Sequence, residues 1–170
     1  MRRALAPLTL VTLLVVGAQL AIFTSLRVAG VVVMLVWLWP LAVGLAGYTA
    51  LGVAAGALAG LFFDTHGTTP FGLSALVGMT VAYGASRLGR EGVGDLDSAA
   101  WWVTPALAAL GGLLAPLLFV AFGVLTFDLG LWRGSLLQAM AVNAGAFFVL
   151  ARPVTRVARA VGRVGERARR

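Results

Sequence analysis

The stretch GLFFDTHGTTPFGL, residues 60–73, joins two apolar runs and carries the only carboxylate between Met1 and Ser86. The run before it is rich in glycine, whereas the residues after Asp64 are rich in turn-forming types. This order predicts two helices joined by a tight tip over residues 64–70. The rest of the chain is hydrophobic sequence with arginines at its edges, so this helical hairpin is the segment around which the fold is organised.

The composition is typical of a polytopic integral membrane protein. Hydrophobic residues make up 61% of the 170 residues and charged residues 11%, whereas about a quarter of the residues of a soluble domain carry charge. The net charge is +7, every basic residue is an arginine, and most arginines lie outside the apolar runs. This distribution favours a positive membrane-flanking edge and argues against nucleic-acid binding. Because the chain has no cysteine, disulfides, thiolate metal sites and cysteine nucleophiles are excluded.

Six apolar runs predict an all-α bundle of six transmembrane helices, which forms one domain over residues 1–151. The runs cover about 5–26, 28–47, 49–63, 71–86, 101–125 and 135–151. The first run is too long for a cleaved signal peptide, so we interpret it as the first span. The third and fourth runs would form only about 22–24 Å of helix, against a hydrocarbon core of about 30 Å. They are therefore short spans or a re-entrant hairpin.

The second run contains Trp37, Trp39 and Pro40 near its middle. A proline inside a helix removes a backbone donor and predicts a kink or local unwinding. The two tryptophans could instead mark a membrane interface, in which case the second span would begin later. The sequence leaves these two interpretations open.

The arginines set the predicted orientation. With both termini inside the cell, the inner segments hold 11 arginines and the outer segments hold two, Arg27 and Arg133. The positive-inside rule therefore predicts an N-in, C-in topology. A re-entrant hairpin would leave four spans and the same orientation.

Three glycines of the third run, Gly52, Gly56 and Gly60, recur every four residues, and Asp64 continues the series. Overlapping small-xxx-small repeats let another helix approach closely, so these residues predict a helix-packing face. An acid at membrane depth usually faces protein or water. Two interpretations of Asp64 stay open. It is either an ion-binding or partner-contact acid, or a cap that accepts hydrogen bonds from nearby threonines or backbone N–H groups.

The residues that follow the acid fit turn chemistry. Pro70 suits the first turn of the fourth helix, with Thr68 or Thr69 as its N-cap. Gly72 supplies backbone freedom for the reversal. His66 is the only histidine, and no second His, Cys or acid stands at metal-ligand spacing from it. We therefore interpret His66 as a structural or solvated loop residue and expect no metal site.

The chain offers little material for catalysis. No acid–base pair is evident among the six acids, no serine has a Gly-x-Ser-x-Gly setting, and no nucleotide-binding loop appears. We expect neither an enzyme nor a cofactor. The clearly polar side chains inside the predicted spans are Gln19, Gln138 and Asn143. Interhelical hydrogen bonding is favoured over ligand binding for all three.

Residues 152–170 predict a basic amphipathic tail on the cytoplasmic side. Four valines, at positions 154, 157, 161 and 164, recur at helical spacing between the arginines. Such a helix suits contact with an anionic inner leaflet. A frayed topogenic tail and a docking site for a cytoplasmic partner are the alternatives. The arginines expected at the membrane surface are Arg152, Arg156, Arg159, Arg163 and Arg167.

The chain resembles the bacterial rod-shape-determining protein MreD family. The resemblance is carried by the glycine-rich run that ends in Asp64, the turn Pro70-Phe71-Gly72-Leu73 and the pair Tyr83-Gly84 in the next helix. The segment 52–76 is its specific part, and elsewhere the match is one of hydropathy. One departure is that family members often enter the second span through a Pro-Asp or similar acidic pair, where this chain has Val32-Val33-Met34.

The resemblance implies a non-enzymatic inner-membrane component of the cell-elongation machinery. Such proteins associate with MreC, and with MreB, RodA and a class B penicillin-binding protein in a wider complex for peptidoglycan synthesis. On this basis we expect the glycine face of the third helix to pack against an MreC-type partner, with Asp64 and its loop as a polar contact outside. The family fold also looks like the six-helix S-component of energy-coupling-factor transporters. A vitamin-type substrate-binding subunit of a transporter is therefore the alternative.

Overall fold

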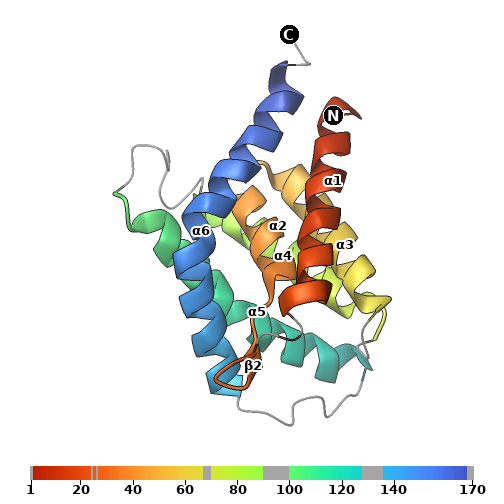
Figure 1. The fold of residues 1–170 in the computed structure, drawn as a ribbon, viewed down its shortest axis with the longest axis vertical. Coiled ribbons are helices and arrows are strands. Elements are labelled where there is room, and N and C mark those ends of the chain that lie inside the picture. The colour runs from red at the N-terminus through yellow and green to blue at the C-terminus, as the bar shows by residue number, and fades with distance from the viewer. Residues whose placement is uncertain are drawn as a thin grey trace.

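The computed structural model is a bundle of six α-helices and one small hairpin (Figure 1). It describes residues 2–23, 25, 27–66, 70–89, 100–127 and 136–167. A π-helical turn, Gln19–Phe23, extends the first helix, and strands β1 (Arg27–Val28) and β2 (Val31–Val32) pair antiparallel. The predicted all-α fold with six helices is confirmed for these residues. The helices are α1 (Arg2–Ala18), α2 (Leu35–Leu45), α3 (Thr49–Asp64), α4 (Leu73–Arg87), α5 (Val103–Phe127) and α6 (Leu136–Arg167).

Three of these helices are long and apolar enough to cross a membrane, through the segments Leu5–Ile22, Val103–Leu125 and Leu136–Val164. The other three, α2, α3 and α4, have 11, 16 and 15 residues, which correspond to about 16–24 Å of helix. The expected shortness of the third and fourth helices is therefore confirmed. The second helix is shorter still.

The second helix begins later than predicted. We expected helix from about residue 28, but residues 27–32 form the β1–β2 hairpin and α2 starts at Leu35. Ala29 and Gly30 connect the strands with φ values of 49° and 80°. Positive φ at both central residues is what a two-residue type I′ turn requires. The valines on either side favour extended backbone, and they keep this segment out of the helix.

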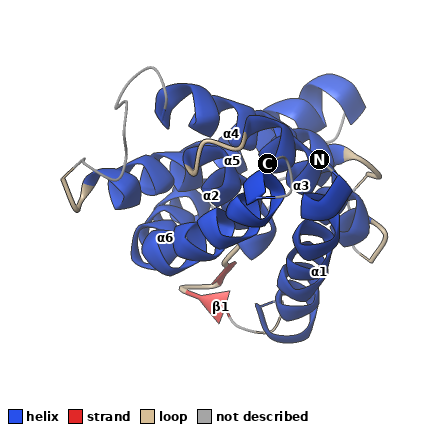
Figure 2. Ribbon diagram, turned by 90° about the horizontal axis from the view of Figure 1, so that it is seen from above, coloured by secondary structure: helices blue, strands red, loops and turns tan. Residues whose placement is uncertain are grey.

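α2 lies in the middle of the bundle (Figure 2), and each of the other five helices contacts it. Every residue from Val36 to Leu45 is buried. The Trp37 ring packs against Phe119 with 5.4 Å between ring centroids, and Trp39 Nε1 donates a hydrogen bond to Thr12 Oγ1 at 2.9 Å. Both tryptophans therefore belong to the core of the bundle and are not exposed on its outer surface.

The sixth helix continues without a break into the predicted tail as far as Arg167. It has 32 residues, or about 48 Å of helix, and its end lies at the same end of the bundle as the start of α1 (Figure 1). Ala158 and Val161 are buried in a cluster with residues of α1, α2 and α3, whereas Val157 and Val164 are exposed. One part of the valine face of the tail thus packs against the bundle, and the other part is exposed.

Candidate functional site

Asp64 ends α3 and caps α4. Its side chain is 5% exposed, and its Oδ2 accepts hydrogen bonds from the backbone N–H groups of Gly72 at 2.9 Å and Ser74 at 3.1 Å. These donors lie at the N-terminus of a helix, where backbone N–H groups lack intrahelical partners and the helix dipole favours negative charge. Of the two interpretations left open by the sequence, the capping role is the one that these bonds show.

The fourth helix starts three residues after Pro70, which was expected in its first turn. The Pro70 carbonyl accepts a hydrogen bond from Leu73 N–H at 3.1 Å, and Gly72 is the N-cap with φ 93° and no side-chain cap. The placement of Pro70 inside the helix was therefore wrong, because the cap is supplied by α3. The predicted backbone freedom at Gly72 is confirmed, since this φ favours glycine. Thr68 and Thr69 lie outside the described residues.

Two glycines of the predicted packing face let the backbones of α3 and α4 touch. A Cβ atom on Gly60 would lie 2.1 Å from Ala75 N, and one on Gly56 would lie 2.5 Å from the carbonyl carbon of Gly78. Both neighbours are backbone atoms, which cannot move aside as the end of a side chain can. No larger residue fits at either position without separating the two helices.

The third glycine faces α2 and α4 together. A Cβ atom on Gly52 would lie 3.1 Å from Gly44 N and 3.3 Å from Ala82 Cβ. The helix that approaches the glycine face is therefore α4 of the same chain, supported at one end by α2. Since this face is already occupied, a separate MreC-type protein would have to contact other surfaces of α3.

Gln19 and Asn143 cap the buried start of α2 from distant parts of the chain. Gln19 Oε1 accepts a hydrogen bond from Leu35 N–H at 2.6 Å, and Asn143 Oδ1 accepts one from Met34 N–H at 2.9 Å. Both side chains are almost completely buried. The predicted hydrogen bonding between elements is thus confirmed for these two, with the backbone of α2 as the partner. Gln138 donates to the Ala29 carbonyl in the β-hairpin turn.

The tip of the α3–α4 hairpin exposes aromatic side chains around the buried acid. Phe71 is 65% exposed and Phe62 is 43% exposed. His66 is exposed too, and its Nδ1 lies 2.9 Å from Thr65 Oγ1 and 3.0 Å from the Phe62 carbonyl oxygen. These contacts place His66 in the turn that ends α3, as a local structural residue. A partner that reaches the tip would meet its aromatic and imidazole rings before Asp64.

The arginines of α6 are mostly on the surface. Arg152 is exposed, its Nη2 donates to the Trp101 carbonyl at 2.6 Å, and its guanidinium lies 5.1 Å from the centre of the Trp101 ring. Arg156 and Arg163 are exposed and Arg159 is partly buried. The side chain of Arg167, the last residue of α6, lies outside the described part. The structure holds no membrane, so surface contact by these arginines stays a prediction.

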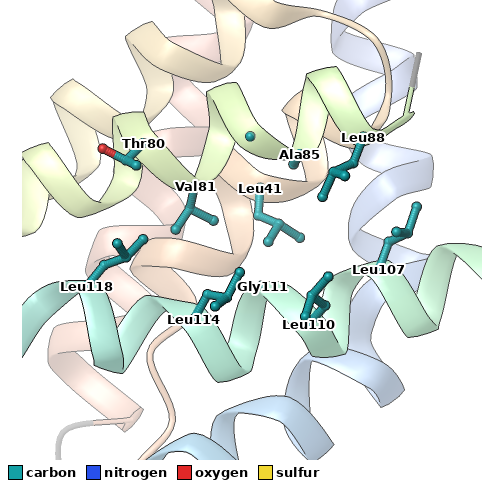
Figure 3. Close-up of a pocket in the computed structure, with 11 residues that line it drawn as sticks. Leu41, Thr80, Val81, Ala85, Leu88, Leu107, Leu110, Gly111, Leu114 and Leu118 are labelled. Atoms are coloured by element: carbon teal, nitrogen blue, oxygen red, sulfur yellow. The ribbon is translucent and has the colours of Figure 1, made fainter. Parts of the chain in front are cut away.

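An apolar groove of about 170 Å³ lies between α4 and α5 (Figure 3). It is lined by Thr80, Val81, Gly84 and Ala85 of α4, Leu88 directly after α4, Leu107, Leu110, Gly111, Leu114 and Leu118 of α5, and Leu41 of α2. Small-molecule sites are usually about 300–1,000 Å³ and have several convergent polar groups. This groove is smaller and offers one hydroxyl. It therefore gives the substrate-binding alternative no support.

Sequence reasoning missed this groove and the hairpin before α2. Gly84 was the available signal for the groove, since a small residue can leave space on its helix face and a Cβ atom there would meet nothing within 4 Å. Asp64 is the one acid whose side chain lies in the described residues, and within those residues no three potential metal ligands gather. The site as a whole is a set of capped helix starts and glycine contacts.

Over the described part of the chain, these observations define an all-α bundle with three helices that are long and apolar enough to cross a membrane. No family model, curated protein or solved structure matches the chain. The resemblance to the rod-shape family and the expected likeness to S-components therefore stay predictions from the sequence.

Proposed function

We propose that this chain is a multi-pass protein of the bacterial cytoplasmic membrane that serves as a non-enzymatic scaffold of the cell-elongation machinery. The six helices are embedded in the bilayer, with both termini on the inner side. The three long apolar helices support the membrane location. So does their apolar outer surface, since Leu14, Leu125 and Val149 are 64%, 82% and 73% exposed. Apolar surface of this kind suits lipid or protein contact better than water.

The observation that best supports the scaffold role is that the buried polar side chains bond to the backbone of other helices. Asp64, Gln19 and Asn143 each accept hydrogen bonds from backbone N–H groups at the start of another helix. A catalytic or transport acid would instead face a substrate or a water-filled path. These side chains hold the helices in place, which supports a structural function.

The partners we propose are an MreC-type protein and, in the wider complex, MreB, RodA and a class B penicillin-binding protein. Their identity rests on the resemblance of residues 52–76 to the rod-shape family. The glycine face is closed by α4, so we place the contact at the exposed tip, on Phe62, His66 and Phe71. Exposed aromatic side chains are frequent anchors of protein interfaces.

Co-purification from native membranes tests this contact. Phe71→Ala should reduce recovery of the MreC-type protein about tenfold, the effect of one interface anchor of 1–2 kcal/mol. The matched control is Phe148→Ala on α6, because Phe148 is also an exposed aromatic residue. Equal recovery from the two variants would place the contact elsewhere.

Depletion of the protein in a rod-shaped native host tests the function itself. The proposal predicts that rods become spheres and that the wild-type gene restores them. Cells that keep their rod shape and their pattern of peptidoglycan insertion after depletion would exclude a role in elongation.

A further inference from the structure

The groove between α4 and α5 has an apolar lining, and Arg152 lies against Trp101, just before α5 begins. We infer that the groove binds one acyl chain of an anionic phospholipid from the inner leaflet, with the phosphate held by Arg152. This inference rests on the membrane placement proposed above and is independent of the partners in the elongation machinery.

The lining fits a hydrocarbon chain. Among the described residues that line the groove, Thr80 alone has a hydroxyl group, and its Oγ1 already donates to the Leu76 carbonyl at 2.8 Å. A polar ligand would find no convergent donors or acceptors there. A volume of about 170 Å³ admits a chain of methylene groups but not a whole helix, because a helix with its side chains is about 10 Å across.

The space exists because one position of α4 has no side chain. A Cβ atom on Gly84 would meet nothing within 4 Å. On the facing side, Leu110 and Leu114 of α5 (Figure 3) are each 40% exposed, so the groove is accessible from the surface of the bundle. Lipid can therefore enter from the side without any movement of the helices.

Leu88 and Leu107 line one end of the groove (Figure 3), and two arginines are near this end in the chain or in contact with its neighbours. Arg87 ends α4, but its guanidinium lies 5.9 Å from the centre of the Tyr83 ring, which does not line the groove. Arg152 is held against Trp101, just before α5 begins. One hydrogen bond of the Arg152 guanidinium is accounted for among the described residues, and arginine has five N–H donors. The remaining donors suit the oxygen atoms of a phosphate.

The depth of this end matches a lipid headgroup. Trp101 and Trp102 are 69% and 54% exposed, and exposed tryptophans favour the level of the headgroups. The arginine distribution predicts that this end faces the cytoplasm, where the leaflet is rich in anionic lipids. An arginine at headgroup depth beside a hydrocarbon-lined groove suits an anionic phospholipid, which is the abundant anionic amphiphile of that leaflet.

Lipid retention by the full chain tests the inference. The protein is reconstituted into vesicles of phosphatidylcholine and phosphatidylglycerol, extracted in mild detergent and examined by native mass spectrometry. The wild type should retain phosphatidylglycerol in preference to phosphatidylcholine. Gly84→Leu should lose this lipid because the new side chain fills the groove. Gly145→Leu is the matched control, since its Cβ atom also meets nothing within 4 Å but lies on α6.

Two further variants keep the test decisive if Gly84→Leu folds poorly. Leu114→Phe fills the groove from α5 and should lose the same lipid. Arg152→Gln should lower phosphatidylglycerol occupancy about fivefold at limiting lipid, whereas Arg156→Gln, one turn further along α6, should have a smaller effect.

Equal retention by Gly84→Leu and Gly145→Leu, or equal retention of both lipids by the wild type, would overturn the inference. Flotation with the vesicles tests the membrane placement separately from the lipid site. A protein that does not float contradicts the membrane placement and this site with it. A protein that floats but shows no selective retention contradicts this site alone.

Discussion

The two sides of α4 show opposite uses of glycine. Toward α3, Gly78 faces Gly56 so closely that the two backbones touch. Toward α5, Gly84 faces open space and forms part of an apolar groove. The two glycines are six residues apart on one helix, yet one is required for packing and the other leaves a cavity. What lies opposite a small residue decides its role.

The contacts on the two sides of α4 also differ in how tightly they are packed. The α3–α4 side is fixed by backbone contact and by the Asp64 cap, whereas on the α4–α5 side the side chains surround an apolar groove. Interiors without such space respond strongly to added volume. We therefore expect the same kind of substitution to have very different effects on the two sides.

The largest effect is expected from Gly56→Leu. Its Cβ atom would lie 2.5 Å from the backbone of Gly78, so folding should be lost or destabilised by more than about 3 kcal/mol. Thermal unfolding in detergent measures the change, with Gly145→Leu at an open position as the control. If Gly56→Leu unfolds at the wild-type temperature, the helices do not touch there.

Replacement of Asp64 should have the next largest effect. Asp64→Ala leaves two N–H groups of α4 without this acceptor and should destabilise the fold by about 2 kcal/mol. Asp64→Asn keeps one acceptor oxygen without the charge and should cost about half as much. The same unfolding measurement compares them, and a stable Asp64→Ala protein would contradict the capping role.

Asn143→Leu should destabilise the buried start of α2. The Met34 N–H would lose its side-chain acceptor inside the bundle, at a cost of about 1–3 kcal/mol. Hydrogen exchange at the first turn of α2 reports the loss directly. Protection that stays at the wild-type level would show that Asn143 does not cap this helix.

Gly84→Ala should have the smallest effect, and in the opposite direction. The added Cβ atom meets nothing within 4 Å, and alanine favours the helix over glycine by up to about 1 kcal/mol. A small rise in unfolding temperature is expected. A fall similar to that of Gly56→Leu would mean that this side of α4 is as tightly packed as the other.

Local features of the sequence predicted much of this architecture. The four-residue spacing of the α3 glycines predicted close packing, and the apolar runs predicted the order of six helices. The position of Asp64 next to a turn made capping one of two interpretations. Each of these features depends on residues that are near one another in the chain, which is why sequence patterns could reveal them.

Features that depend on distant residues could not be predicted in the same way. The acceptor for Met34 N–H is Asn143, 109 residues away, and no spacing rule connects the two. The helix that closes the glycine face was also unknown, because a small-residue stripe does not identify its partner. Likewise, the groove depends on how α4 and α5 cross, which a pattern within one helix does not determine.

Cysteine cross-linking tests the central claim, that α4 of the same chain closes the glycine face of α3. The chain has no cysteine of its own, so a pair introduced as Gly52→Cys and Ala82→Cys is read without background. A Cβ atom on Gly52 would lie 3.3 Å from Ala82 Cβ, close to the distance of about 3.8 Å that a disulfide needs. Oxidation in native membranes should give an intrachain disulfide in this variant and none in the control pair Gly52→Cys with Gly145→Cys. Free thiols, or cross-links only to another protein, would contradict the account.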